Sequence, residues 1–81
     1  MGYNRDEIAN IIIETIKEVT FKKVTINDNL VNDGIIDSIT VVDISVILED
    51  LFKIKIPFVD LNEQHFGSID SIANYIVLKL S

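Results

Sequence analysis

The sequence predicts an all-α protein, a small four-helix bundle with three main helices, one short helix and a long first loop. Three observations support this. Apolar residues recur at intervals of three and four in three segments, which is the helical period. Polar turn residues separate these segments, and the chain has a single proline. Since 48% of the 81 residues are hydrophobic, residues 1–81 can fill the core of a single domain.

The first predicted helix covers residues 5–19. Asn4 and Glu7 have the spacing of a capping box at its start. Four apolar residues repeat on one face: Ile8, Ile12, Ile16 and Val19. The long loop of residues 20–37 follows, and its length is typical of a loop that is anchored or functional. We expect five apolar residues to anchor it over the helices: Val24, Ile26, Leu30, Ile35 and Ile36.

The second predicted helix covers residues 38–52, with Asp37 or Ser38 as its N-cap, and is apolar on two sides. The larger side is expected in the core: Val41, Ile44, Leu48, Leu51 and Phe52. The smaller side, called here the apolar strip, consists of Ile39, Val42 and Val46. Three acidic residues surround it: Asp43, Glu49 and Asp50. No Lys or Arg occurs between Lys23 and Lys53, so we expect this face to meet a partner.

The rest of the chain predicts a short helix and a long one. Pro57 favours extended backbone at residue 56, and residues 60–66 can form one or two helical turns. Ser68 is the expected N-cap of the last helix, residues 69–80. Five residues are expected to face inward there: Ile69, Ile72, Ala73, Ile76 and Leu80.

The charge balance argues against several classes of function. Thirteen acidic and seven basic residues give a net charge of −6, whereas nucleic acids and anionic membranes attract basic surfaces. No apolar run approaches the roughly 20 residues that cross a bilayer, and no signal peptide is evident at the start. With no Cys and one His, no metal site is expected. We expect a cytoplasmic protein whose partners carry positive charge.

Ser38 is the candidate functional residue, and three interpretations of it are open. A serine in the first turn of a helix is commonly a cap and nothing more. As a hydrolase nucleophile it would depend on His65, and the Gly-x-Ser-x-Gly elbow is missing. As a modified serine it is well placed, because it is expected to be exposed beside the apolar strip and at a helix N-terminus, where amides favour phosphate.

Four stretches together resemble the acyl carrier protein family. Residues 33–39 (DGIIDSI) look like its prosthetic-group site, where a serine follows an aspartate. Residues 42–44 (VDI), 48–57 (LEDLFKIKIP) and 66–69 (FGSI) are similar to the family's downstream motifs at the right distances. Gly34 stands three residues before Asp37, an arrangement more like aminoacyl, D-alanyl or specialised-pathway carriers than fatty-acid carriers.

The resemblance implies a non-enzymatic monomer with 4′-phosphopantetheine attached to Ser38 by a separate transferase that uses coenzyme A. The arm would carry acyl or aminoacyl groups as thioesters to loading and acyl-using enzymes with basic docking patches. Asp37, Asp43, Glu49 and Asp50 would steer these partners, and Ile39, Val42 and Val46 would make the apolar contact. The alternative is an unmodified acidic docking module of the same fold.

Overall fold

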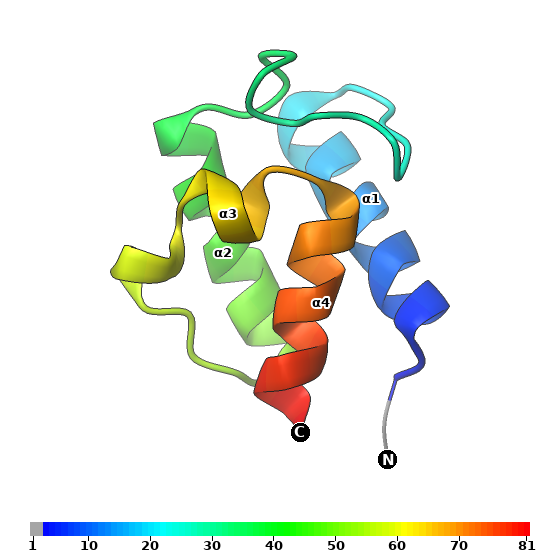
Figure 1. The fold of residues 1–81 in the computed structure, drawn as a ribbon, viewed down its shortest axis with the longest axis vertical. Coiled ribbons are helices and arrows are strands. Elements are labelled where there is room, and N and C mark those ends of the chain that lie inside the picture. The colour runs from blue at the N-terminus through cyan, green and yellow to red at the C-terminus, as the bar shows by residue number, and fades with distance from the viewer. Residues whose placement is uncertain (1–2) are drawn as a thin grey trace.

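The structure is a computed structural model, and it describes residues 3–81. Four α-helices and one 3₁₀ turn follow one another along the chain (Figure 1): α1 (Arg5–Thr20), α2 (Ser38–Phe52), η1 (Phe58–Asp60), α3 (Glu63–Phe66) and α4 (Ile69–Leu80). Residues 3–81 contain no β-strand, only an isolated bridge between Asn29 and Ser68. The prediction of a helical bundle with three main helices and one short helix is confirmed.

The core lies between the three long helices. α1 packs against α4 and α2, and the short α3 packs against α4. The large side chains at the centre come from every α-helix and from the first loop. They are fully buried: Ile8, Ile12, Ile16, Leu30, Ile44, Leu48, Phe66, Ile69, Ile72 and Ile76. Burial of these apolar surfaces is the main term that stabilises such a fold.

Polar side chains begin each long helix where the sequence predicts. Asn4 and Glu7 form the predicted capping box, in which each side chain accepts a hydrogen bond from the other's backbone N–H, at 2.8 and 2.9 Å. Asp37 caps α2, and Ser68 Oγ caps α4 by accepting from the N–H of Ser71 at 3.1 Å. These bonds satisfy amides that have no partner within the helix.

The long first loop lies across one end of the bundle and is pinned at Leu30. The N–H of Leu30 donates to the carbonyl of Gly67 at 2.8 Å, and the Leu30 side chain is fully buried. The anchors expected at Val24, Leu30 and Ile36 are confirmed as buried, and Ile35 packs partly against the core. Ile26 was predicted wrongly. It is 44% exposed because it lies in the turn closed by Thr25 and Asp28.

Two residues predicted in the core lie outside it. Leu51 is 46% exposed and Leu80 is 39% exposed. Both occupy the last turn of their helices and line an open groove there, so the apolar period continues onto a surface that the core does not cover. Tyr75 of α4, which is not among the residues expected to face inward, is buried.

The segment from Ile54 to Phe66 runs back along α2 toward its N-terminus and is held by polar contacts. Glu49 Oε2 accepts from the N–H of Ile56 at 2.7 Å. The hydroxyl of Tyr75 on α4 donates to Asp60 Oδ2 at 2.5 Å. Farther along, Leu61, Asn62 and Glu63 lie across a groove from Ser38. The segment therefore flanks α2 from the level of Glu49 to the level of Ser38.

Candidate functional site

Ser38 is the first residue of α2, and both Ser38 and its neighbour Asp37 are exposed. Asp37 has extended backbone (φ −121°) and is the N-cap. Its Oδ1 accepts hydrogen bonds from the N–H groups of Ile39 at 3.0 Å and Thr40 at 2.8 Å. The cap therefore fixes the first turn of α2, and with it the backbone that carries the Ser38 hydroxyl.

The capping bonds lower the pKa of the Asp37 carboxyl below its usual 3.8. The largest cause is the hydrogen bond from the backbone of Thr40, followed by its side chain, while partial desolvation opposes the shift. Hydrogen bonds to the ionised form favour that form. Asp37 thus supplies a fixed negative charge next to Ser38 at neutral pH.

Because of these bonds, fewer free helix amides are available to a phosphate at Ser38 than the sequence predicts. Two of the three amides in the first turn, those of Ile39 and Thr40, already donate to Asp37. The N–H of Ser38 itself makes no hydrogen bond within residues 3–81. The helix N-terminus thus leaves one amide without a partner within residues 3–81, that of Ser38, next to the ionised Asp37 carboxylate.

A small apolar groove of about 190 Å³ opens beside Ser38. The N-terminal turns of α2 form one wall, the first loop a second, and the start of α3 the third. The lining residues are Val31, Ile36, Asp37, Ser38, Val41, Leu61, Asn62, Glu63 and Phe66. Drug-sized ligands occupy pockets of about 300 Å³ and more, so this groove has room for only part of a long arm and its cargo.

His65 does not line that groove. Its ring lies against Tyr75, with the ring centroids 4.9 Å apart, on the α4 side of α3. The arrangement lacks the hydrogen-bonded serine–histidine pair that a hydrolase needs. The hydrolase interpretation of Ser38 therefore has no geometric support within residues 3–81.

The apolar strip on α2 is exposed at its two ends and partly covered in the middle. Ile39 is 75% exposed and Val46 is 57% exposed. Val42 lies between them, is half-buried and packs partly against the core. Large apolar side chains left in water on one helix face are typical of interaction surfaces.

The acidic residues around the strip differ in their surroundings. Asp43 and Asp50 are exposed, and Asp50 makes only a loose ion pair with Lys53, at 3.8 Å. Glu49 is half-buried, and its carboxylate already accepts the hydrogen bond from Ile56. Asp43 and Asp50 are thus the carboxylates most open to a partner, whereas Glu49 has an internal structural role.

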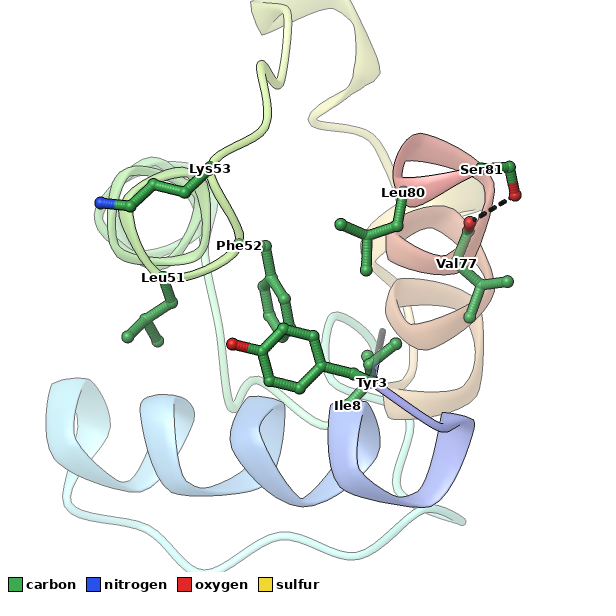
Figure 2. Close-up of a pocket in the computed structure, with 8 residues that line it drawn as sticks. All are labelled: Tyr3, Ile8, Leu51, Phe52, Lys53, Val77, Leu80 and Ser81. Atoms are coloured by element: carbon green, nitrogen blue, oxygen red, sulfur yellow. Dashed lines mark hydrogen bonds between the residues drawn. The ribbon is translucent and has the colours of Figure 1, made fainter. Parts of the chain in front are cut away.

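A second and larger groove, of about 470 Å³, lies at the opposite end of α2 (Figure 2). Tyr3 and Phe52 meet edge to face there, with ring centroids 5.0 Å apart, and Val77 and Leu80 of α4 form another side. Figure 2 shows the Lys53 side chain directed away from the two rings. The 15 residues of α2 place Phe52 about 21 Å from Ser38, so this groove does not belong to the same site.

Sequence reasoning missed an exposed apolar pair in η1. Phe58 is 77% exposed and Val59 is 79% exposed, next to the segment that lines the Ser38 groove. The available signal was their position after Pro57, in a stretch without the helical apolar period. The interaction surface was predicted from the helical pattern of α2, and the turn that runs beside α2 has no such pattern.

Comparison with known proteins agrees with this geometry. The family model described as phosphopantetheine attachment site matches residues 6–76. The chain therefore belongs to the phosphopantetheine attachment-site family, and its domain is an attachment site for covalently bound 4′-phosphopantetheine. It is a carrier protein of the acyl carrier type, and carrier domains of this family are not catalytic. No curated protein matches the chain.

Two further observations concern the described part of the chain. Within residues 3–81, no helix has the length and apolar character needed to cross a membrane. No group of three or more His, Asp or Glu side chains in the same range is gathered in a way that could hold a metal ion.

Proposed function

We propose that Ser38 is the attachment residue and that the arm on it carries acyl or aminoacyl thioesters between enzymes. The observation that carries this proposal is the exposed Ser38 hydroxyl, held at the start of α2 by the Asp37 cap, in a chain of the attachment-site family. The Ser38 oxygen would attack the pyrophosphate of coenzyme A, forming a phosphodiester and releasing 3′,5′-ADP. A separate transferase would supply the catalytic groups.

The carrier's own contribution is positional. A mobile arm keeps its cargo at high effective concentration near each enzyme that docks on the carrier. The exposed ends of the apolar strip, Ile39 and Val46, and the open carboxylates Asp43 and Asp50 support docking by partners with basic patches. Asp37 and Glu49 add charge to the same face. We further propose that residues 1–81 act as one carrier domain and that the protein is a cytoplasmic monomer.

Intact mass after incubation with coenzyme A and a promiscuous phosphopantetheinyl transferase tests the attachment residue. We expect one phosphopantetheinyl group on the wild type and none on Ser38→Ala. The side chain is exposed and makes no capping bond, so Ser38→Ala should keep its helicity by circular dichroism. Addition to Ser38→Ala would show that the residue is wrong. A folded wild type that two different transferases fail to modify would favour the unmodified docking module.

A further inference from the structure

The η1 turn displays two neighbouring large apolar side chains to solvent. Phe58 and Val59 are 77% and 79% exposed, and no side chain caps the turn. Large apolar side chains left in water forgo the stabilisation that burial gives. Such a pair is most useful where a partner covers it, because aromatic residues are enriched in the cores of interfaces.

The turn is held in place although its apolar side chains are free. The turn begins two residues after Ile56, whose N–H donates a hydrogen bond to the Glu49 carboxylate on α2. Its last residue, Asp60, accepts the hydrogen bond from Tyr75 on α4. Burial of Tyr75, with this bond and the charges of Asp60 and Glu49, raises the pKa of the Tyr75 hydroxyl further above neutral pH. A contact that is already ordered loses little entropy on binding.

The turn also lies close to Ser38. The N–H of Leu61 donates to the carbonyl of Phe58 at 3.0 Å, and Leu61 lines the groove beside Ser38. A standard interface covers about 800 Å² on each partner, which is a patch roughly 30 Å across. An interface of this size centred on Ser38 is therefore wide enough to include the turn as well as the first turns of α2. In Figure 1 the turn stands out at the left edge, away from α1.

We infer that Phe58 and Val59 form a second apolar contact, besides the apolar strip, for the transferase that modifies Ser38. This inference rests on the proposed function. The occupant is an enzyme with an apolar pocket rimmed by Lys or Arg. The charges support this choice, since Asp37, Asp43 and Glu63 are exposed and no Lys or Arg follows the turn until Lys79.

Steady-state modification by a promiscuous phosphopantetheinyl transferase with coenzyme A, followed by intact mass, tests the contact. Phe58→Ser and Val59→Ser should each raise the KM for the carrier about tenfold with kcat little changed, because they remove binding made before the chemical step. The matched control is Leu78→Ser on α4. Leu78 is 74% exposed, and its neighbour Val77 lines the groove at the far end of α2, so we expect less than a twofold change.

The outcomes separate this inference from the proposed function. If Ser38 of the wild type is modified and both turn variants match it within twofold, the contact is wrong and the attachment residue stands. If the wild type is not modified, both fail. Val59→Thr keeps the shape of the side chain and exchanges one methyl group for a hydroxyl. It serves as the test if either serine variant melts below the wild type by circular dichroism, and an unchanged KM for Val59→Thr would then overturn the contact.

Discussion

At the scale of single residues, Asp37 contributes both structure and charge at the site. It caps α2 through two amide hydrogen bonds, and those bonds hold its pKa below the usual 3.8. A carboxyl with a lowered pKa in the folded state stabilises the fold above its unfolded pKa. That contribution is lost as the pH falls through the lower, folded pKa. The stability of the first turn should therefore depend on pH in the acid range.

Asp37→Asn should reduce the loss of stability on acidification from pH 5 to pH 3. Asparagine is a good N-cap but does not titrate in this range, so the variant lacks the Asp37 contribution to the pH dependence. Urea unfolding at pH 5, 4 and 3 measures the free energy of unfolding. Asp43→Asn, which removes the same charge farther along the helix, serves as the control. Parallel pH curves for the wild type and Asp37→Asn would contradict the prediction.

At the scale of elements, both α1 and α2 end in a left-handed cap that is not glycine. Phe21 has φ 61° and Lys53 has φ 56°. In each case the N–H of the cap residue closes the helix by donating to a carbonyl four residues earlier, Lys17 or Glu49. Phe21 is 90% exposed, so it bears the cost of this conformation without gaining packing in return.

Phe21→Gly should stabilise the protein by about 0.5–1 kcal/mol. Glycine adopts the left-handed region without the steric cost, which exceeds the extra entropy that glycine gains in the unfolded chain. Thermal unfolding followed by circular dichroism measures the effect. Phe21→Ala removes the same ring but keeps the Cβ, so we expect no gain from it. Equal melting temperatures for the two variants would show that the gain does not come from the backbone conformation.

The three long helices were predictable from sequence to within about a residue because their signals are local, whereas the short helix predicted at residues 60–66 covers only Glu63–Phe66 and follows a separate 3₁₀ turn. The period of apolar residues, the Asn4–Glu7 box, and caps at Asp37 and Ser68 act within one or two turns. The errors at Leu51, Leu80 and Ile26 share a cause. Whether each side chain is buried depends on what other segments pack against it, and the pattern of one segment carries no such information. The bond between Glu49 and Ile56 joins two segments in the same way.

The candidate site was also predictable where its signals are local and not where it depends on several segments. Ser38, Asp37 and the exposed ends of the strip lie on one helix, and helical spacing was enough to group them. The groove beside Ser38 needs three segments, from the first loop, α2 and α3, and the η1 pair depends on how the chain returns along α2. Contacts between segments distant in sequence are set by the packing of the whole core, so they appeared only with the structure.

At the scale of the whole molecule, negative charge is crowded on a small body. The net charge is −6, the extents are 34 × 25 × 20 Å, and residues 3–81 contain two ion pairs, Arg5–Asp70 and Lys53–Asp50. At 0.01 M salt the Debye length is about 30 Å, comparable with the whole molecule, and at 0.15 M it is about 8 Å. Salt should therefore relieve repulsion across the surface.

The melting temperature should rise by about 4 °C between 0.01 M and 0.15 M NaCl, which corresponds to about 1 kcal/mol for a domain of this size. Chloride is preferable to sulfate, since sulfate also strengthens apolar burial. A variant with both Asp43→Asn and Asp50→Asn should show a smaller rise. A melting temperature that stays flat or falls with NaCl in the wild type would rule out repulsion as a significant cost.

The two ends of the described chain lie at one groove, far from Ser38. Tyr3 and Ser81 line the same groove at the C-terminal end of α2, with the length of that helix between them and Ser38 (Figure 2). A solid support attached at Ser81 would therefore hold the molecule at the end opposite the Ser38 hydroxyl. Immobilised in this orientation, every copy would offer Ser38 and the η1 turn to enzymes in the surrounding solution.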